Sequence, residues 1–486
     1  MNKSIYFEIK EAKNGELIPY FQNGKSIDSI YNPDREATTI VSKISSEYDY
    51  FIITGLGSGK VVNELLNANK KCRIFVIENS KEDYTFLSKI PLVNKLFYNN
   101  RIAFSTIDNL VQDLQNDYIP AIYGDFKLIE RPNWISQINL QELNHNISST
   151  INKINNDYAT QQFFGKKWQS NIIKNLKLHS SLNKKQKEIN ITKKNAIIIA
   201  AGPPLDSKID YIREIKKDYI IIATDTTFSI LSKYNINCDF VLSIDGQSFS
   251  YNHFFENSSN FENTFFLFDF CANAQTIKKV SKITQNIGFF SNNHPFFTII
   301  PKKFPKIDSV SGTVTMAALD FAIKMGFEKI NILGADFGYL NGKSYAKGTY
   351  FDSIYNINTS KISTNETFFD KLLFRTNLIQ EKTKKTTILL KNYEKSLEYY
   401  LNEKHLSFKF ENFCYIINNN LQKTITFESF FSDFKYDELK NKIMQLNQEE
   451  LSVVLLPYIA YLRKNSKNLK WEEYLNKAHS DLLRLL

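Results

Sequence analysis

Three apolar runs, each ending abruptly in small, polar or acidic residues, dominate the middle of this chain. They cover Ala196–Ala200, Tyr219–Ala223 and Phe240–Ile244. Short apolar, β-branched runs with helix-length connections between them predict parallel strands that are buried on both faces. Open parallel sheets bind ligands beyond the carboxyl ends of their strands, so the residues that follow each run are candidates for a functional site. These candidates are Gly202, Asp225 and Asp245.

A fourth apolar run, Lys329–Leu333, follows a helical pattern and adds Asp336 to the same predicted sheet edge. Ser311 and Thr313 precede that helix, where a hydroxyl can cap free N–H groups and where the helix N-terminus attracts a phosphate or carboxylate. The loop after Asp336 is rich in Lys and Tyr, whose donor groups suit an anionic leaving group without a metal. Its candidate residues are Tyr339, Lys343, Tyr345 and Tyr350.

A glycine-rich turn lies nearer the N-terminus, between the apolar runs Tyr50–Ile53 and Arg73–Ile77. Glycines permit a tight turn at a helix N-terminus, and an acidic residue after the second strand can hold a ribose. The pattern predicts a Rossmann-like domain, which more often serves as a structural scaffold than as a cofactor site. The residues of the possible ligand site are Gly55, Gly57, Gly59 and Glu78.

The length of 486 residues predicts two or three domains, each with its own core. We expect a Rossmann-like domain with a helical linker over 1–185, a central, mainly parallel α/β domain over 186–355, and a helical domain over 356–486. No run approaches the ~18 apolar residues of a membrane span, so no membrane insertion is expected. The four isolated cysteines fit a reducing compartment, and we expect a cytoplasmic protein.

The formal net charge is +10, from 61 Lys and Arg against 51 Asp and Glu. Scattered lysines are typical of solvated loops and helix faces. The chain carries no recognisable module with aromatic residues interleaved among arginines, so nucleic-acid binding is not expected. An acidic small molecule or an acidic protein partner remains compatible with the charge.

The order of the motifs GPPL, ATDTTF, VLSIDG and SGTVTMAALDFAIKMGFEKINILGADF resembles the motility-associated factor (Maf) family. Maf proteins share their central domain with an archaeal 6-hydroxymethylpterin diphosphokinase family, and this domain is similar in fold to bacterial metal-independent sialyltransferases. The GLGSG unit is also similar to the Maf arrangement, so the resemblance covers the first two domains. It implies a cofactor-independent glycosyltransferase that moves a nonulosonic, sialic-acid-like sugar from a CMP donor to Ser or Thr of flagellin and so supports motility.

The resemblance also implies roles for the candidate residues. The turn under the nucleotide would be formed by Gly202, Pro203 and Pro204. The donor ribose or base would be faced by Asp225, Thr226 and Thr227. The donor phosphate or sugar carboxylate would be held by Ser311, Gly312 and Thr313. The departing CMP phosphate would be stabilised by Tyr339, Lys343, Tyr345 and Tyr350, and Asp245 would stand beside the reacting centre.

Two positions depart from the patterns of these relatives. Pro204 stands where the sialyltransferase-like turn usually carries Ser, so one hydroxyl donor is missing. Tyr345 stands where many Maf relatives carry His. If a general base is needed, Asp245 or Asp336 would accept the proton of the acceptor hydroxyl.

Two alternatives to the glycosyltransferase remain open. A pterin diphosphokinase-like phosphotransferase would hold magnesium between carboxylates, for which Asp225 and Asp245 are the candidates, so a magnesium requirement is left undecided. A non-catalytic adaptor that binds flagellin would keep the fold without the chemistry. Magnesium-dependent release of AMP from ATP would favour the first, and flagellin binding without affinity for CMP would favour the second.

Overall fold

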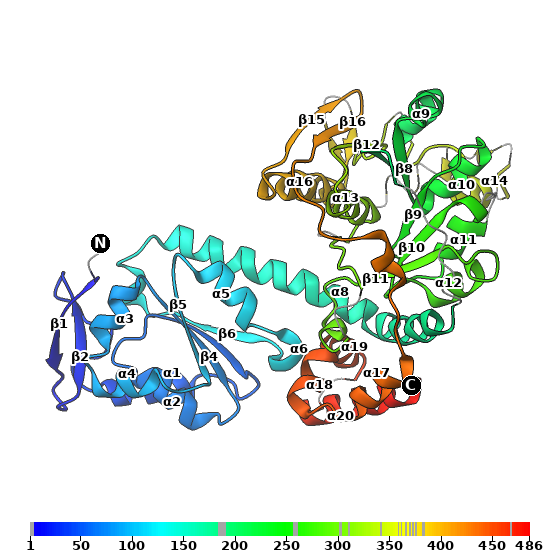
Figure 1. Ribbon diagram of the computed structural model, residues 1–486. Helices are drawn as coiled ribbons and strands as arrows, with labels where there is room; N and C mark the ends of the chain where they lie inside the picture. The colour runs from blue at the N-terminus through cyan, green and yellow to red at the C-terminus, as the bar shows by residue number, and fades with distance from the viewer. Residues whose placement is uncertain are drawn as a thin grey trace. The chain divides into compact units, whose positions relative to one another are not determined.

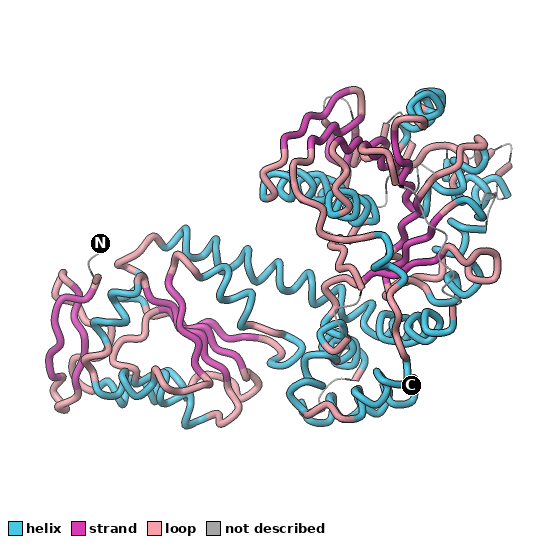
Figure 2. The backbone as a smooth tube through the Cα atoms, in the orientation of Figure 1, coloured by secondary structure: helices cyan, strands magenta, loops and turns pink. Residues whose placement is uncertain are grey.

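The computed structural model describes residues 4–182, 191–255, 261–300, 304–309, 312–340, 343–357, 359–360, 362–364, 367–368, 371, 374, 377–381, 384–466 and 469–486. Contacts divide the chain into two compact units. The first comprises Met1–Gly165 and Leu456–Tyr474, and the second comprises Lys166–Leu455 and Leu475–Leu486. Each unit is an α/β structure with a mainly parallel sheet at its centre, and Figure 2 shows helices beside the strands of each sheet.

The first unit contains a four-stranded parallel sheet in the order β5-β4-β3-β6, and β4, β5 and β6 are labelled in Figure 1. Its central strands are buried on both faces because they are almost wholly apolar. The strands are β3 (Tyr50–Thr54), β4 (Arg73–Glu78), β5 (Ile102–Thr106) and β6 (Phe126–Ile129). A separate antiparallel hairpin consists of β1 (Tyr6–Glu11) and β2 (Leu17–Phe21). The predicted Rossmann-like unit is therefore present.

Short helices connect these strands, and a long helix follows them. They are α1 (Pro33–Ser42), α2 (Lys60–Ala68), α3 (Lys81–Leu87), α4 (Pro91–Leu96), α5 (Leu110–Asp117), α6 (Pro120–Tyr123), α7 (Pro132–Ile135) and α8 (Leu140–Ser181). Helix α8 continues from the first unit into the second. The helical linker predicted before residue 185 is thus a single 42-residue helix.

The second unit contains an eight-stranded sheet in the order β11-β10-β9-β8-β7-β12-β16-β15. The first six are parallel, and β16 and β15 join the sheet antiparallel. The parallel strands are β7 (Asn195–Ile199), β8 (Tyr219–Thr224), β9 (Phe240–Ser243), β10 (Phe265–Asp269), β11 (Ile287–Phe290) and β12 (Lys329–Leu333), and the antiparallel strands are β15 (Ser407–Glu411) and β16 (Cys414–Asn418). All four strands predicted in the middle of the chain are present.

The order of the strands reverses at β7. The chain proceeds from β7 through β8, β9, β10 and β11 toward one edge, and β12 then pairs on the other side of β7. In an open parallel sheet, connections that leave in opposite directions from such a point open a crevice at the carboxyl ends of the strands. The topology therefore places the best ligand position between β7 and β12.

Helices and short segments surround this sheet, and α13 is one of the most buried of them. Its residues Met316–Ile323 are all buried because they are apolar except for Asp320, whose carboxylate accepts a hydrogen bond from Lys324 Nζ at 2.7 Å. The α-helices that lie wholly in the unit are α9 (Ile209–Ile215), α10 (Asp225–Lys233), α11 (Ser250–Phe255), α12 (Ala274–Val280), α13 (Val314–Lys324), α14 (Tyr350–Ile357), α16 (Ile388–Glu403), α17 (Tyr436–Met444) and α18 (Gln448–Val454).

The C-terminal region is mostly helical, as predicted, but it does not form a unit of its own. Residues 356–455 belong to the second unit, where β15 and β16 extend the sheet and α16 packs beside it. Helix α19 (Leu456–Asn465) belongs to the first unit, and α20 (Trp471–Leu485) continues from the first unit into the second. The division also falls at residue 165, inside α8, and not near 185. Among the described residues, every helix is too short or too polar to cross a membrane.

Candidate functional site

A cavity of about 360 Å³ lies in the second unit at the carboxyl ends of β7, β8 and β12, which is the position that the strand order favours. Residues from the turns after these strands line it together with the first residues of α10 and α13. Two side chains from α16, Leu390 and Tyr393, complete the wall. Three strands and the C-terminal region therefore contribute to one site.

Two glycines allow the turns after β7 and β12 to cross closely. The amide of Gly202 donates to the carbonyl of Gly334 at 2.9 Å. A Cβ on Gly202 would lie 1.9 Å from Oδ1 of Asp336, and a Cβ on Gly334 would lie 2.2 Å from the carbonyl oxygen of Ala200. Gly334 also has a φ of +75°, which disfavours other residues. Because neither glycine has a side chain, the two turns can approach closely, and the carboxyl group of Asp336 lies against Gly202 in the turn after β7.

Asp336 is a buried carboxyl group at the edge of this cavity. Its exposed fraction is 3%, and neither of its oxygens has a hydrogen-bond partner among the described residues. Burial raises the pKa of Asp336 to about 7, although the positive charge of Lys384 acts in the opposite direction. A carboxyl group with this pKa can exchange a proton near neutral pH, which suits a general base.

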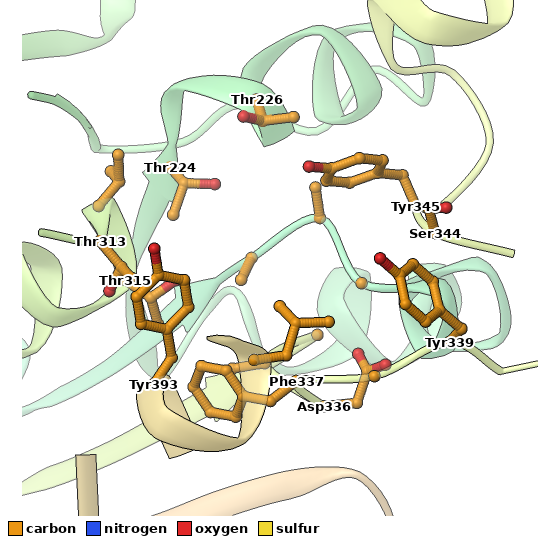
Figure 3. Close-up of a pocket in the computed structure, with 18 of the residues that line it drawn as sticks. Thr224, Thr226, Thr313, Thr315, Asp336, Phe337, Tyr339, Ser344, Tyr345 and Tyr393 are labelled. Carbon is orange, nitrogen blue, oxygen red and sulfur yellow. The ribbon is translucent and has the colours of Figure 1, made fainter. Parts of the chain in front are cut away.

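Hydroxyl groups supply most of the other polar atoms. Figure 3 shows the hydroxyls of Tyr339, Tyr345 and Tyr393 turned toward the space that the lining residues enclose. The ring of Tyr345 is stacked on Phe351, and burial raises the pKa of its hydroxyl, which therefore remains a donor at neutral pH. The other hydroxyl residues of the lining are Thr224, Thr226, Thr313, Thr315 and Ser344.

The N-termini of two helices lie at the cavity. The hydroxyl of Thr313 caps α13 by accepting from the amide of Met316 at 3.2 Å. The amides of Val314 and Thr315 also belong to the first turn and have no acceptor within the helix. The N-terminus of α13 can therefore bind a phosphate or carboxylate.

Asp225 begins α10 and is held firmly by its neighbours. Its Oδ1 accepts from the amide of Thr226 at 2.8 Å, and its Oδ2 accepts from the hydroxyl of Ser243 at 2.7 Å. Both carboxylate oxygens are thus engaged, and the side chain is 2% exposed. Asp225 links the ends of β8 and β9 and holds its carboxyl group in a fixed position at the lining.

The structure brings seven of the predicted site residues together in this cavity. They are Gly202, Asp225, Thr226, Thr313, Asp336, Tyr339 and Tyr345. They come from three strand ends and one helix N-terminus, as the predicted parallel sheet requires. Their convergence is the main agreement between the sequence and the site.

Several predicted residues do not line the cavity. Pro203 and Pro204 are buried in a turn of 3₁₀ helix, and Thr227 is buried with its hydroxyl donating to the carbonyl of Ile199 at 2.9 Å. Gly312 lies in the turn before α13, outside the lining. Ser311 lies outside the described residues.

Three further candidates, Asp245, Lys343 and Tyr350, are also directed elsewhere. Asp245 follows β9 as predicted, but its Oδ1 accepts from the amide of Gln247 at 2.8 Å, and it is not part of the lining. The ammonium group of Lys343 lies 3.7 Å from the carboxylate of Asp206. The ring of Tyr350 contacts His253 edge-on, with 4.8 Å between the ring centroids.

The possible N-terminal ligand site is filled by protein groups. Oε1 of Glu78 accepts from the amide of Leu56 at 2.6 Å and from the hydroxyl of Tyr6 at 3.0 Å, and Oε2 accepts from Nε1 of Trp134 at 2.7 Å. Burial raises the pKa of Glu78 to about 8. The ring of Trp134 occupies the space above Gly55, where a Cβ would lie 2.6 Å from it. A nucleoside has no room beside Glu78.

Sequence reasoning missed the contribution of α16 and of Phe337. The stretch that contains Leu390 and Tyr393 has a clear helical period, but a local pattern does not say which distant helix will complete a pocket. Phe337 has a φ of +47°, an unusual value for a bulky residue, and this shows only in the structure. Within the described part of the chain, no group of three or more His, Cys, Asp or Glu side chains is arranged to hold a metal ion.

The chain is similar to known proteins in sequence and in fold. Residues 166–342 match the family described as 6-hydroxymethylpterin diphosphokinase MptE-like. The whole chain superposes on the structure of a Maf glycosyltransferase from Magnetospirillum magneticum AMB-1, with a TM-score of 0.51, 10% identity and 86% of that chain covered. At this identity the likeness shows the fold.

Two uncharacterized proteins of Treponema pallidum (strain Nichols) are similar in sequence. One is 36% identical over 120 residues, which are 24% of this chain and 42% of that protein. The other is 34% identical over 145 residues, which are 29% of this chain and 67% of that protein. The match thus spans less than half of the first relative. Together, the comparisons show that residues 166–342 are similar to the MptE-like family and that the chain has a fold similar to that of a Maf glycosyltransferase.

Proposed function

We propose that this chain is a glycosyltransferase that moves a nonulosonic sugar from a CMP-activated donor to a Ser or Thr hydroxyl of flagellin, in the cytoplasm. The observation that carries the proposal is the cavity at the β7–β12 switch point, where eight hydroxyl side chains, a helix N-terminus and the buried carboxyl group of Asp336 meet. The fold of a Maf glycosyltransferase supports it. The identities of sugar and acceptor rest on the sequence resemblance.

Hydroxyl groups and helix N-termini suit a donor of this kind. Each hydroxyl can both donate and accept, and so can pair with the hydroxyls of a sugar or ribose. The first turn of α13 offers free amides to the phosphate or the sugar carboxylate. The described lining contains no Lys or Arg, so an anionic donor would rely on amide and hydroxyl donors.

The chemistry would be a single displacement. Asp336, as a carboxylate, takes the proton of the acceptor hydroxyl, and the acceptor oxygen forms a bond to the anomeric carbon of the sugar. The bond from that carbon to the phosphate oxygen breaks, and CMP departs with the electron pair. The hydroxyls of Tyr345 and Tyr339 donate to the departing phosphate. We favour Asp336 over Asp245 as the base because Asp336 is at the lining and has unpaired oxygens.

Intact-mass measurement of flagellin tests the proposal in cells. Flagellin from cells that lack this gene should be lighter by whole sugar units than flagellin from parental cells, and return of the gene should restore the mass. Unchanged flagellin mass would contradict the proposed acceptor. Flagellin binding by the purified chain without affinity for CMP would favour the adaptor.

The MptE-like match favours one second candidate, a pterin diphosphokinase-like phosphotransferase. This reaction would transfer a diphosphate from ATP to a hydroxymethyl group and release AMP. Incubation of the chain with ATP, magnesium and 6-hydroxymethylpterin distinguishes the two. Release of AMP that requires both magnesium and the pterin would establish the phosphotransferase. If no AMP were released under conditions in which the chain transfers sugar, the phosphotransferase would be excluded.

A further inference from the structure

The glycine-rich loop of the first unit already contains an anion, the carboxylate of Asp28. Oδ2 of Asp28 accepts from the amide of Ser58 at 2.7 Å, one residue before Gly59 caps α2. A Cβ on Gly57 would lie 2.7 Å from the same oxygen, so this glycine permits the close approach. Loops of this kind at a helix N-terminus commonly bind phosphate.

A buried arginine completes the environment of this carboxylate. Nη2 of Arg131 lies 2.8 Å from Oδ1 of Asp28, and the two side chains are 3% and 1% exposed. The same Nη2 donates to the carbonyl of Ile27 at 2.8 Å, which fastens the segment that carries Asp28. Arginine pairs with phosphate as well as with carboxylate, because its planar donors fit both.

Two buried donors of the residues that bind Asp28 have no acceptor among the described residues. The hydroxyl of Ser58 and Nη1 of Arg131 are both buried, and neither has a hydrogen-bond partner among the described residues. Buried donors without partners are rare and costly. A tetrahedral oxyanion has more acceptor oxygens than a carboxylate, and it could engage both orphaned donors along with the amide of Ser58.

The remainder of the loop excludes a larger ligand. Glu78, the residue that would hold a ribose, is fully engaged by Leu56, Tyr6 and Trp134. Trp134 is 0% exposed and covers Gly55. The space that a nucleoside would need is thus filled by Trp134 and by the partners of Glu78. The position of the phosphate group is filled by the carboxylate of Asp28, which a small anion could replace.

We infer that the loop around Ser58, together with Arg131, is a binding site for a small oxyanion such as inorganic phosphate, which Asp28 occupies and keeps closed. The inference concerns the first unit and does not depend on the proposed glycosyltransferase. Removal of the Asp28 carboxylate should leave the donors in place and open the site. Glu36 is a second acid nearby, 3.7 Å from Nη2 of Arg131, and would compete for the guanidinium.

The test is phosphate binding by Asp28→Ala and by Asp28→Ala/Glu36→Gln in the full chain. Equilibrium dialysis with radiolabelled inorganic phosphate at constant ionic strength should show one more bound phosphate than the wild type in each variant. CMP should not displace this phosphate, because the proposed donor cavity lies in the other unit. The midpoint of thermal unfolding of each variant should rise with the logarithm of phosphate concentration.

Two controls separate an opened site from a general effect. Asp28→Ala/Arg131→Met removes both charges, and it should not gain the phosphate. Asp117→Ala breaks the ion pair with Arg73 elsewhere in the same unit, and phosphate should not stabilise it more than it stabilises the wild type. The inference is overturned if phosphate neither binds to nor stabilises either Asp28 variant, whether or not that variant is folded without phosphate. It is also overturned if phosphate stabilises Asp117→Ala as strongly as it stabilises the Asp28 variants.

Discussion

Asp336 is the residue on which the proposed chemistry depends. Because burial raises its pKa to about 7, the carboxylate that can accept a proton becomes the major form only above that pH. We therefore expect kcat/KM for sugar transfer to rise with pH and to level off above about 7. The Asp336→Asn variant should lose about 10²–10⁴-fold in kcat, which is the usual contribution of a general base.

Asp245→Asn is the matched control for this prediction. Asp245 is also a partly buried carboxyl group at a strand end, but it is not part of the lining. Its replacement should leave the pH profile unchanged. Equal losses in the two variants would show that Asp336 has no special role.

The same carboxyl group predicts a dependence of stability on pH. Its folded-state pKa of about 7 is above the value of about 3.9 in an unfolded chain, so the folded protein holds this proton more tightly. Its contribution to the free energy of unfolding is fully present below pH ~4 and is lost as pH rises through about 7. Denaturant titrations at several pH values should show this loss in the wild type relative to Asp336→Asn. If the free energy of unfolding changed with pH in the same way in the wild type and in Asp336→Asn, the raised pKa of Asp336 would be contradicted.

Gly202 offers a test of the close crossing between the two turns. In Gly202→Ala the new Cβ would lie 1.9 Å from Oδ1 of Asp336 and 2.4 Å from the carbonyl oxygen of Gly334. We expect a loss of about 1–3 kcal/mol in the free energy of unfolding, because packed groups must move. Transfer activity should fall as well. Gly246→Ala, whose Cβ would meet nothing closer than 3.0 Å, should cost less in both measurements.

At the scale of secondary structure, the sequence was most informative where strands are buried on both faces. The runs that became β7, β8, β9 and β12 are mostly apolar, although Asn331 lies inside β12, and three of them are followed by an acid, Asp225, Asp245 or Asp336. Strands β10 and β11 were not predicted, and neither were β15 and β16. The last two are half-exposed strands whose place is decided by pairing with β12, a contact between distant segments.

The segment that carries Asp336 is held by a second element, the hairpin of β13 (Ile379–Gln380) and β14 (Lys385–Thr386). Nζ of Lys384 donates to the carbonyl oxygen of Asp336 and to Oε1 of Glu394, each at 2.8 Å. Because Lys384 lowers the pKa of Asp336, its removal in Lys384→Met should move the inflection of the pH–rate profile to higher pH. Rescue by Lys384→Arg would support an electrostatic cause.

Lys391→Met is the control for that experiment. Lys391 pairs with Glu381 at 2.9 Å and is more exposed than Lys384. Its loss should leave the inflection in place, since Asp336 has no contact with it among the described residues. A shift of equal size in both variants would mean that any local charge has the same effect.

At the scale of the whole molecule, contacts do not follow the order of the sequence. The segment Leu456–Tyr474 returns to the first unit, which composition and local pattern could not indicate. This segment packs directly against α8 at Gly165, because a Cβ on Gly165 would lie 1.8 Å from the carbonyl oxygen of Pro457. Gly165→Ala should lower the free energy of unfolding by about 3 kcal/mol. Calorimetry of the full chain measures this, and an unchanged unfolding midpoint would contradict the observed packing.

The central claim is that the cavity between β7 and β12 transfers an activated sugar, and its direct test is transfer by the purified chain. Flagellin incubated with the chain and a CMP-nonulosonic acid should gain mass in whole sugar units. The gain should be lost with Asp336→Asn, while the folded state of the variant is retained. No gain under any donor, or an equal gain with Asp336→Asn, would contradict the account.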